Sequence, residues 1–172
     1  MVRPLIQILQ GANQKSGQRR AAARLLGTLG DPAVAPLLQV LQEAGPDPTA
    51  RKYAIEALGQ LRDARAVEPL IQALLTAESR GVRETAVRAL GQLGDPRAVG
   101  PILKAMGEEE DGLIIYDTEF HIHNELVVDA LVQIGAPAVA PLTQALRDPN
   151  PDVREIAHIV LAKIGSPGKR KD

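Results

Sequence analysis

Side chains that bind metal ions gather in one short segment of the 172-residue sequence. Carboxylates and imidazoles are common metal ligands, and five of them occur within nine residues: Asp117, Glu119, His121, His123 and Glu125. In a helix, Asp117, His121 and Glu125 would share one face, whereas in a strand all five would. We favour a polar helix start that Asp117 or Thr118 caps. The alternative is a single metal site built from Asp117, His121, His123 and Glu125.

An acidic run and an apolar clump come directly before this segment. Residues 108 to 111 are all acidic, and they are followed by Leu113, Ile114, Ile115 and Tyr116. Functional residues concentrate in loops and insertions. Ile114, Ile115 and Tyr116 are therefore candidate contacts for a partner, and the alternative is that they cover a groove between neighbouring helices.

The elements that must position these residues are repeated along the chain. The phrase ALGQLGDPRAVGPILKAM, residues 89 to 106, has close copies that begin near residues 25, 57 and 130. Apolar residues at i, i+3, i+4 and i+7 predict five helices, each with one buried stripe. The stripes are Ala22, Leu25, Leu26 and Leu29; Ala54, Ala57, Leu58 and Leu61; Ala86, Ala89, Leu90 and Leu93; Val127, Ala130, Leu131 and Ile134; and Ala157, Val160, Leu161 and Ile164.

A turn and a second helix follow each of the first four stripes. In the segment Gly94-Asp95-Pro96, glycine suits the positive φ of a helix stop, and aspartate and proline suit the start of the next helix. A second proline, such as Pro101, then falls within the first turn, where its missing N–H is tolerated. The second helix has its own apolar stripe, for example Val34, Leu37, Leu38 and Leu41.

Neither helix of such a pair can bury its stripe alone. Neighbouring pairs must therefore stack, which predicts an all-α fold, an α-solenoid of antiparallel helix pairs. We expect one domain over residues 1–172, with a half repeat at 1–14 and a terminal half repeat at 151–167. The four full repeats span about 15–46, 47–78, 79–120 with an insertion at 107–120, and 121–150.

The paired pattern resembles the HEAT-like repeats first recognised in phycobilisome bilin lyases. The segments GVRETAVRALGQLGDPRAVGPIL and DVREIAHIVLAKIG carry the resemblance, which extends over nearly the whole chain. It implies the solenoid fold. It does not fix the function, because the family includes scaffolds, regulators, lyase subunits, a deoxyhypusine hydroxylase and DNA glycosylases. The hydroxylase's iron ligands would be His-Glu pairs in several repeats, and this sequence has Asn124-Glu125 and no such pair.

Composition excludes several classes of function. Twenty basic and 21 acidic residues give a net charge of −1, so nucleic acid is not an expected partner. Without cysteine there is no disulfide framework or thiolate nucleophile. No signal peptide and no stretch of about 20 apolar residues is present, so we expect a cytoplasmic protein without a membrane partner. No cofactor is predicted.

An arginine recurs three residues before four of the five stripes. The arginines are Arg19, Arg51, Arg83 and Arg154, and Asn124 stands at the fifth position. We interpret the row as structural, with the guanidinium groups bridging carbonyls or turn aspartates of neighbouring units. The alternative is a role in phosphate binding.

A second polar row follows the second-helix prolines at a distance of three residues. It comprises Gln7, Gln39, Gln72, Lys104 and Gln144. Packing does not require these side chains, because the position points away from the apolar stripe. They are therefore candidate contacts for an extended or helical partner, and the alternative is a solvated repeat consensus.

These observations favour a non-catalytic scaffold that binds a protein or peptide on a concave second-helix face. The alternative is an enzyme subunit, either a bilin lyase component or a metal-dependent oxidoreductase built around residues 117–125. Both ends of the array are half repeats, so we also expect weak self-association through apolar residues near Leu5, Ile8 and Leu9 or near Ile156, Val160 and Ile164.

Overall fold

The computed structural model describes residues 1–11, 13–43, 47–77, 79–106 and 120–165, and side chains at 106 and 120–124 are not described. Within these ranges the chain forms α-helices and short 3-10 turns, and no strand occurs there. The helices are α1 (Val2–Gln10), α2 (Ser16–Thr28), α3 (Asp31–Gln42), α4 (Pro48–Leu61), α5 (Val67–Thr76), α6 (Arg80–Leu93), α7 (Val99–Met106), α8 (Phe120–Ile134), α9 (Val139–Ala145) and α10 (Pro151–Gly165).

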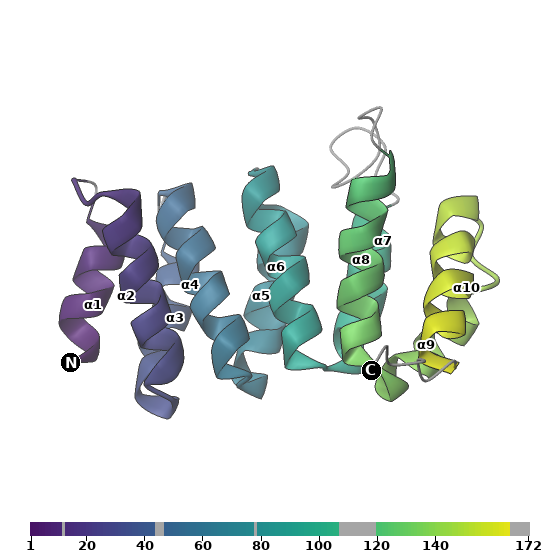
Figure 1. The fold of residues 1–172 in the computed structure, drawn as a ribbon, viewed down its shortest axis with the longest axis horizontal. Helices are drawn as coiled ribbons and strands as arrows, with labels where there is room; N and C mark the ends of the chain where they lie inside the picture. The colour runs from purple at the N-terminus through teal and green to yellow at the C-terminus, as the bar shows by residue number, and fades with distance from the viewer. Residues whose placement is uncertain (12, 44–46, 78, 107–119, 166–172) are drawn as a thin grey trace, which may run out of the picture.

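The helices stand side by side in a row from α1 to α10, as Figure 1 shows. We call α2, α4, α6, α8 and α10 the first helices, and α1, α3, α5, α7 and α9 the second helices. Each first helix packs on the next first helix, and each second helix packs on the next second helix. The two layers also contact each other along the row. The chain is therefore an α-solenoid, as the sequence predicts.

Glycine ends three of the first helices. Gly30, Gly94 and Gly135 all have φ of 73°, a left-handed conformation that favours glycine. Arg62 takes the corresponding place after α4 with φ of 53°, and it is the only non-glycine residue of positive φ among the described residues. The predicted helix stop is confirmed, with arginine in place of glycine in one repeat.

The start of the second helices differs from the prediction in one respect. A single 3-10 turn comes before α5, α7 and α9, at Ala64–Ala66, Pro96–Ala98 and Ala136–Ala138. The second proline is then the third residue of each of these helices. In α3, however, the helix begins at Asp31, so Pro36 lies in its second turn.

Aspartate and arginine form a repeated contact in two of the turns. The Asp63 and Asp95 carboxylates each accept the backbone N–H two residues later, both at 2.9 Å. The same carboxylates pair with the side chains of Arg65 and Arg97, at 2.7 and 2.8 Å. The hydrogen bond from the Arg65 side chain lowers the pKa of Asp63 to about 2, and that from Arg97 lowers the pKa of Asp95.

These turns make the stability of the fold depend on pH. Because both carboxyl pKa values lie below the unfolded value of about 3.9, the turns stabilise the fold above about pH 4 and lose this contribution as the pH falls toward 2. We expect the urea midpoint to drop between about pH 6 and pH 3, and to drop less in the Asp63→Asn/Asp95→Asn double variant. An equal drop in the variant would show that other carboxylates control the effect.

Every residue of the predicted stripes is buried or packs, partly buried, against the core, with one exception. Leu26, Leu58, Leu90 and Leu131 are all fully buried, whereas Leu25 is 54% exposed. The positions equivalent to Leu25 are Ala57, Ala89 and Ala130, and they are at most 2% exposed because the preceding first helix covers them. Among the described residues no first helix precedes α2, so the burial predicted for Leu25 is wrong.

Both ends of the array are better covered than the sequence suggests. Leu9, Ile156 and Val160 are at most 2% exposed, although we expected them to lack a covering neighbour. Helix α1 packs on α2 and α3, and α10 packs on α8 and α9. Self-association through the array ends therefore stays a prediction, without these buried residues as its basis.

Glycines set the spacing between the first helices. A Cβ atom added to Gly59 would lie 2.9 Å from the Ala89 side chain, and one added to Gly91 would lie 2.8 Å from the Ala130 Cα. A Cβ atom added to Gly27 would meet the flexible Gln60 side chain of α4 instead. Glycine at this position of α2, α4 and α6 therefore allows close approach of the next first helix, and Ala89 and Ala130 face Gly59 and Gly91 there.

The recurring arginines connect each helix pair to the next. The Arg19 guanidinium donates to the Gly11 carbonyl, with Nε at 3.1 Å, and also pairs with Asp47. Arg83 donates to the Ala77 carbonyl at 2.7 Å, and Arg154 to the Asp148 carbonyl at 2.7 Å. These carbonyls lie just after the preceding second helix, where helical partners are missing. The structural interpretation is confirmed for these three arginines.

Candidate functional site

The predicted polar row lies on the surface of the second helices. Its residues are all exposed, one on each second helix: Gln7, Gln39, Gln72, Lys104 and Gln144. Three of them line grooves between neighbouring second helices. The row's contact with a partner stays a prediction.

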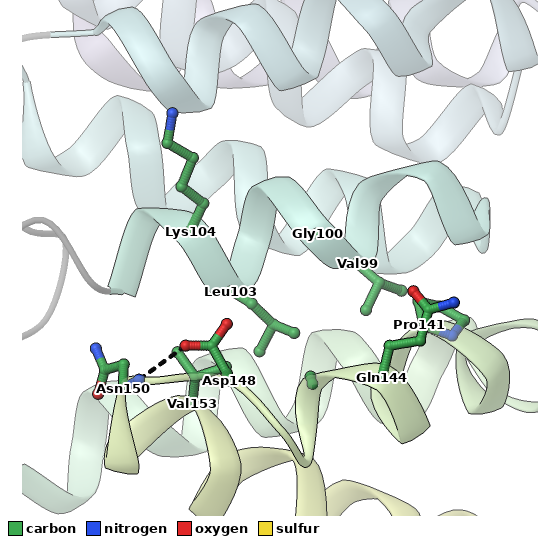
Figure 2. A pocket seen from close by; sticks show the side chains of 10 residues that line it. Val99, Gly100, Leu103, Lys104, Pro141, Gln144, Asp148, Asn150 and Val153 are labelled. Carbon is green, nitrogen blue, oxygen red and sulfur yellow. Dashed lines mark hydrogen bonds between the residues drawn. The ribbon is translucent and has the colours of Figure 1, made fainter.

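One groove lies between α7 and α9, and Figure 2 shows it from close by. It has a volume of about 560 Å³, within the range of ligand-binding clefts. In Figure 2, Leu103 points into the space between the two helices and Lys104 extends away from the other labelled side chains. The Asp148 carboxylate accepts the Asn150 N–H at 2.9 Å. The apolar lining is Val99, Leu103, Pro141, Ala145 and Val153, and the polar lining includes Lys104, Gln144, Asp148 and Asn150.

A second groove lies between α1 and α3, at the other end of the same layer. Its volume is about 430 Å³, and Gln39 is part of its lining. Gln10 donates a hydrogen bond to Glu43 across the two helices. The remaining lining consists of Val2, Arg3, Ile6, Pro32, Pro36 and Val40.

A third groove lies on the first helices, and the sequence did not predict it. We call it the first-helix groove, with a volume of about 420 Å³. It is more polar than the other two, with three basic side chains in its lining. The lining is Arg20, Lys52, Tyr53, Glu56, Gln60, Thr85, Arg88, Ala89 and Gln92. Arg20 and Lys52 each stand nine residues before the last stripe residue of their helix, and this shared position is the signal that could have located the groove.

The candidate metal segment falls largely outside the described residues. Asp117, Glu119, Ile114, Ile115 and Tyr116 all lie outside them. His121 and His123 belong to the first turns of α8, with side chains that are not described, and Glu125 is exposed on the same helix. Where the structure describes side chains, no three His, Cys, Asp or Glu residues form a group that could hold a metal ion. The metal site therefore stays an untested prediction.

None of the described helices is by itself both long and apolar enough to cross a membrane. The segments Glu125–Ile134 and Ala136–Ala145 are together long and apolar enough, but they are bent by 105° relative to each other.

The stacked helix pairs, the glycine stops and the arginine contacts define a class of repeat protein. The chain belongs to the family of HEAT repeats, whose model matches residues 34–120. The model described as PBS lyase HEAT-like repeat matches residues 18–43. A search of curated proteins gives no significant match.

A solved structure is similar over most of the chain. It is described as the complex of CpcE and CpcF of phycocyanin lyase from Nostoc sp. PCC7120. One of its chains matches with 26% sequence identity and a TM-score of 0.61. The match covers 95% of the present chain and 65% of that chain, so the present chain spans slightly less than two thirds of its relative.

These comparisons correct the functional interpretation of the sequence. We expected a non-catalytic scaffold, with an enzyme subunit as the alternative. Both the repeat match at residues 18–43 and the similar solved structure point to lyase subunits. The scaffold interpretation is therefore contradicted, and the bilin lyase alternative is favoured. The error arose because repeat periodicity reports the packing of helices and carries no information about chemistry.

Proposed function

We propose that the chain is a subunit of a bilin lyase and acts in a complex with a second protein subunit. The observation that carries this proposal is the match to a chain of the phycocyanin lyase complex, at 26% identity over 95% of the present chain. A likeness of this extent involves most of the array rather than a single repeat.

The surface of the array supports the proposal in two ways. The grooves have volumes of about 420 to 560 Å³, within the range of small-molecule sites. The exposed row on the second helices offers hydrogen-bonding side chains along the array, as contacts with a second subunit require. In this proposal the second helices contact the protein partner.

Reconstitution with the phycocyanin lyase subunits tests the proposal. The assay mixture contains the purified chain, phycocyanin from which the chromophore is absent, and a free bilin. Either CpcE or CpcF is then added as the second subunit. We expect a visible-absorbing bilin adduct that stays with phycocyanin after denaturation, and we expect it with one of the two subunits only. Absence of both an adduct and a stable complex with either subunit would contradict the proposal.

A double variant of the polar row extends the same assay. Gln39→Ala/Gln72→Ala is expected to weaken association with the second subunit while changing the free energy of unfolding by less than about 1 kcal/mol, because both side chains are exposed. The matched control is Gln133→Ala, an exposed glutamine on first helix α8. Since the amides carry no charge, association should depend only modestly on salt.

A further inference from the structure

The three grooves differ in the charge of their linings. The groove between α7 and α9 has one cation, Lys104, and one carboxylate, Asp148. The groove between α1 and α3 likewise has Arg3 and Glu43. The first-helix groove has three cations, and Glu56 is its one carboxylate. It alone of these three grooves has a net positive lining, in a chain whose net charge is −1.

The cations of the first-helix groove are not used by the fold. Most arginines described above bind a carboxylate or a backbone carbonyl that the array itself supplies. Among the described residues, by contrast, no ion pair or hydrogen bond engages the Arg20, Lys52 or Arg88 side chain. The nearby carboxylate of Glu84 is already held by Arg80 at 2.9 Å. These three cations are therefore available to an external anion.

Stacking of the first helices brings these cations to one groove. Arg20 on α2 and Lys52 on α4 hold equivalent positions on helices that pack together. Arg88 comes from α6, which packs on the other side of α4. Tyr53, Gln60 and Gln92, also in the lining, add hydrogen-bonding groups. Three cations from three successive helices give two or more contact points for separate anionic groups on one ligand.

We infer that the first-helix groove binds a ligand with two carboxylates. The inference rests on the proposed function, in which these are the two propionates of an open-chain tetrapyrrole. Carboxylates suit the groove because guanidinium and ammonium groups form charge-assisted hydrogen bonds with them. The uncharged part of the tetrapyrrole contacts the ring of Tyr53. The substrate and the second subunit then use opposite layers of the array.

Titration with biliverdin, a linear tetrapyrrole with two propionates, tests this inference. Binding of the full chain is followed by visible absorbance, with biliverdin dimethyl ester as the uncharged probe. An exposed cation that contacts a carboxylate contributes roughly two- to fivefold in affinity, so Arg20→Gln/Lys52→Gln/Arg88→Gln is expected to weaken biliverdin binding about tenfold or more. The ester should bind wild type and variant equally weakly, and salt should weaken only biliverdin binding.

Two single variants separate a specific site from general charge. Glu56→Gln removes the one carboxylate of the lining and is expected to tighten biliverdin binding roughly two- to fivefold. Arg24→Gln removes an exposed charge from α2 outside the lining and should leave binding unchanged. Wild-type affinity in the triple variant, or an equal loss in Arg24→Gln, would overturn the inference. The absence of biliverdin binding to the wild type would also overturn the inference. If an adduct still formed in the reconstitution assay, the proposed function would stand without this site.

Discussion

Replacing Leu90 with alanine is expected to lower the free energy of unfolding by about 2–5 kcal/mol, the range for a large-to-small change in a packed core. Leu90 is fully buried in α6, which packs on α4, α5 and α8. Contacts from both layers hold the site, so it cannot easily collapse around the lost methyl groups. Urea unfolding followed by far-ultraviolet circular dichroism measures the change.

Leu25→Ala is the matched control for this prediction. It removes the same atoms from a first helix, but the Leu25 side chain is 54% exposed, so we expect a change within about 0.5 kcal/mol. Leu58 is fully buried in α4 and should respond as Leu90 does. Similar losses for Leu25→Ala and Leu90→Ala would show that burial in the array does not determine the cost.

Gly91→Ala should also destabilise the fold, although alanine is the better helix former. The new Cβ atom would lie 2.8 Å from the Ala130 Cα, which is backbone and cannot rotate away. Helices α6 and α8 must therefore separate, and overpacking of this kind costs roughly 1–3 kcal/mol. This cost is set against a gain of up to about 1 kcal/mol from helix propensity. We expect a net decrease in the urea midpoint.

Gly100→Ala controls for helix propensity alone. Gly100 lies in α7, where an added Cβ atom has no neighbour within 4 Å. This variant should be as stable as the wild type or up to about 1 kcal/mol more stable. If Gly91→Ala behaved in the same way, the close contact between α6 and α8 would not restrict the array.

The periodicity of the sequence was enough to predict the arrangement of helices. A stripe at i, i+3, i+4 and i+7 identifies the buried side of a helix, and Leu26, Leu58 and Leu90 are fully buried as expected. The stripe does not show whether a neighbouring helix is present on each side, and for this reason the predicted burial of Leu25 was wrong. The 3-10 turns before α5, α7 and α9 were not predicted either, because the Asp63-Ala64-Arg65, Asp95-Pro96 and Ala136-Pro137 segments suit both types of helix start.

The candidate sites were less predictable than the fold. The exposed row of Gln39, Gln72 and their equivalents follows from the helical period, since every member has the same offset from a proline. The first-helix groove does not follow from the helical period, because Arg20, Lys52 and Arg88 are distant in the sequence. Arg20 and Lys52 hold equivalent positions in their helices, but Arg88 holds a different position in α6. A groove depends on the spacing between helices, and the sequence expresses that spacing only indirectly, through residues such as Gly59.

The glycine contacts between first helices have a consequence for how such arrays grow and shrink. Gly27, Gly59 and Gly91 stand at the same position of α2, α4 and α6, and a Cβ atom added to any of them would lie within 3.0 Å of the next first helix. A helix pair deleted or duplicated at these joints would therefore meet a similarly close neighbour. Helix α8 has partly buried Val132 at the corresponding position, so its contact with α10 lacks the glycine of the other joints. We therefore expect exchange of helix pairs to be tolerated at the joints after α2, α4 and α6, whereas a pair exchanged across the α8–α10 joint would need compensating substitutions on both sides.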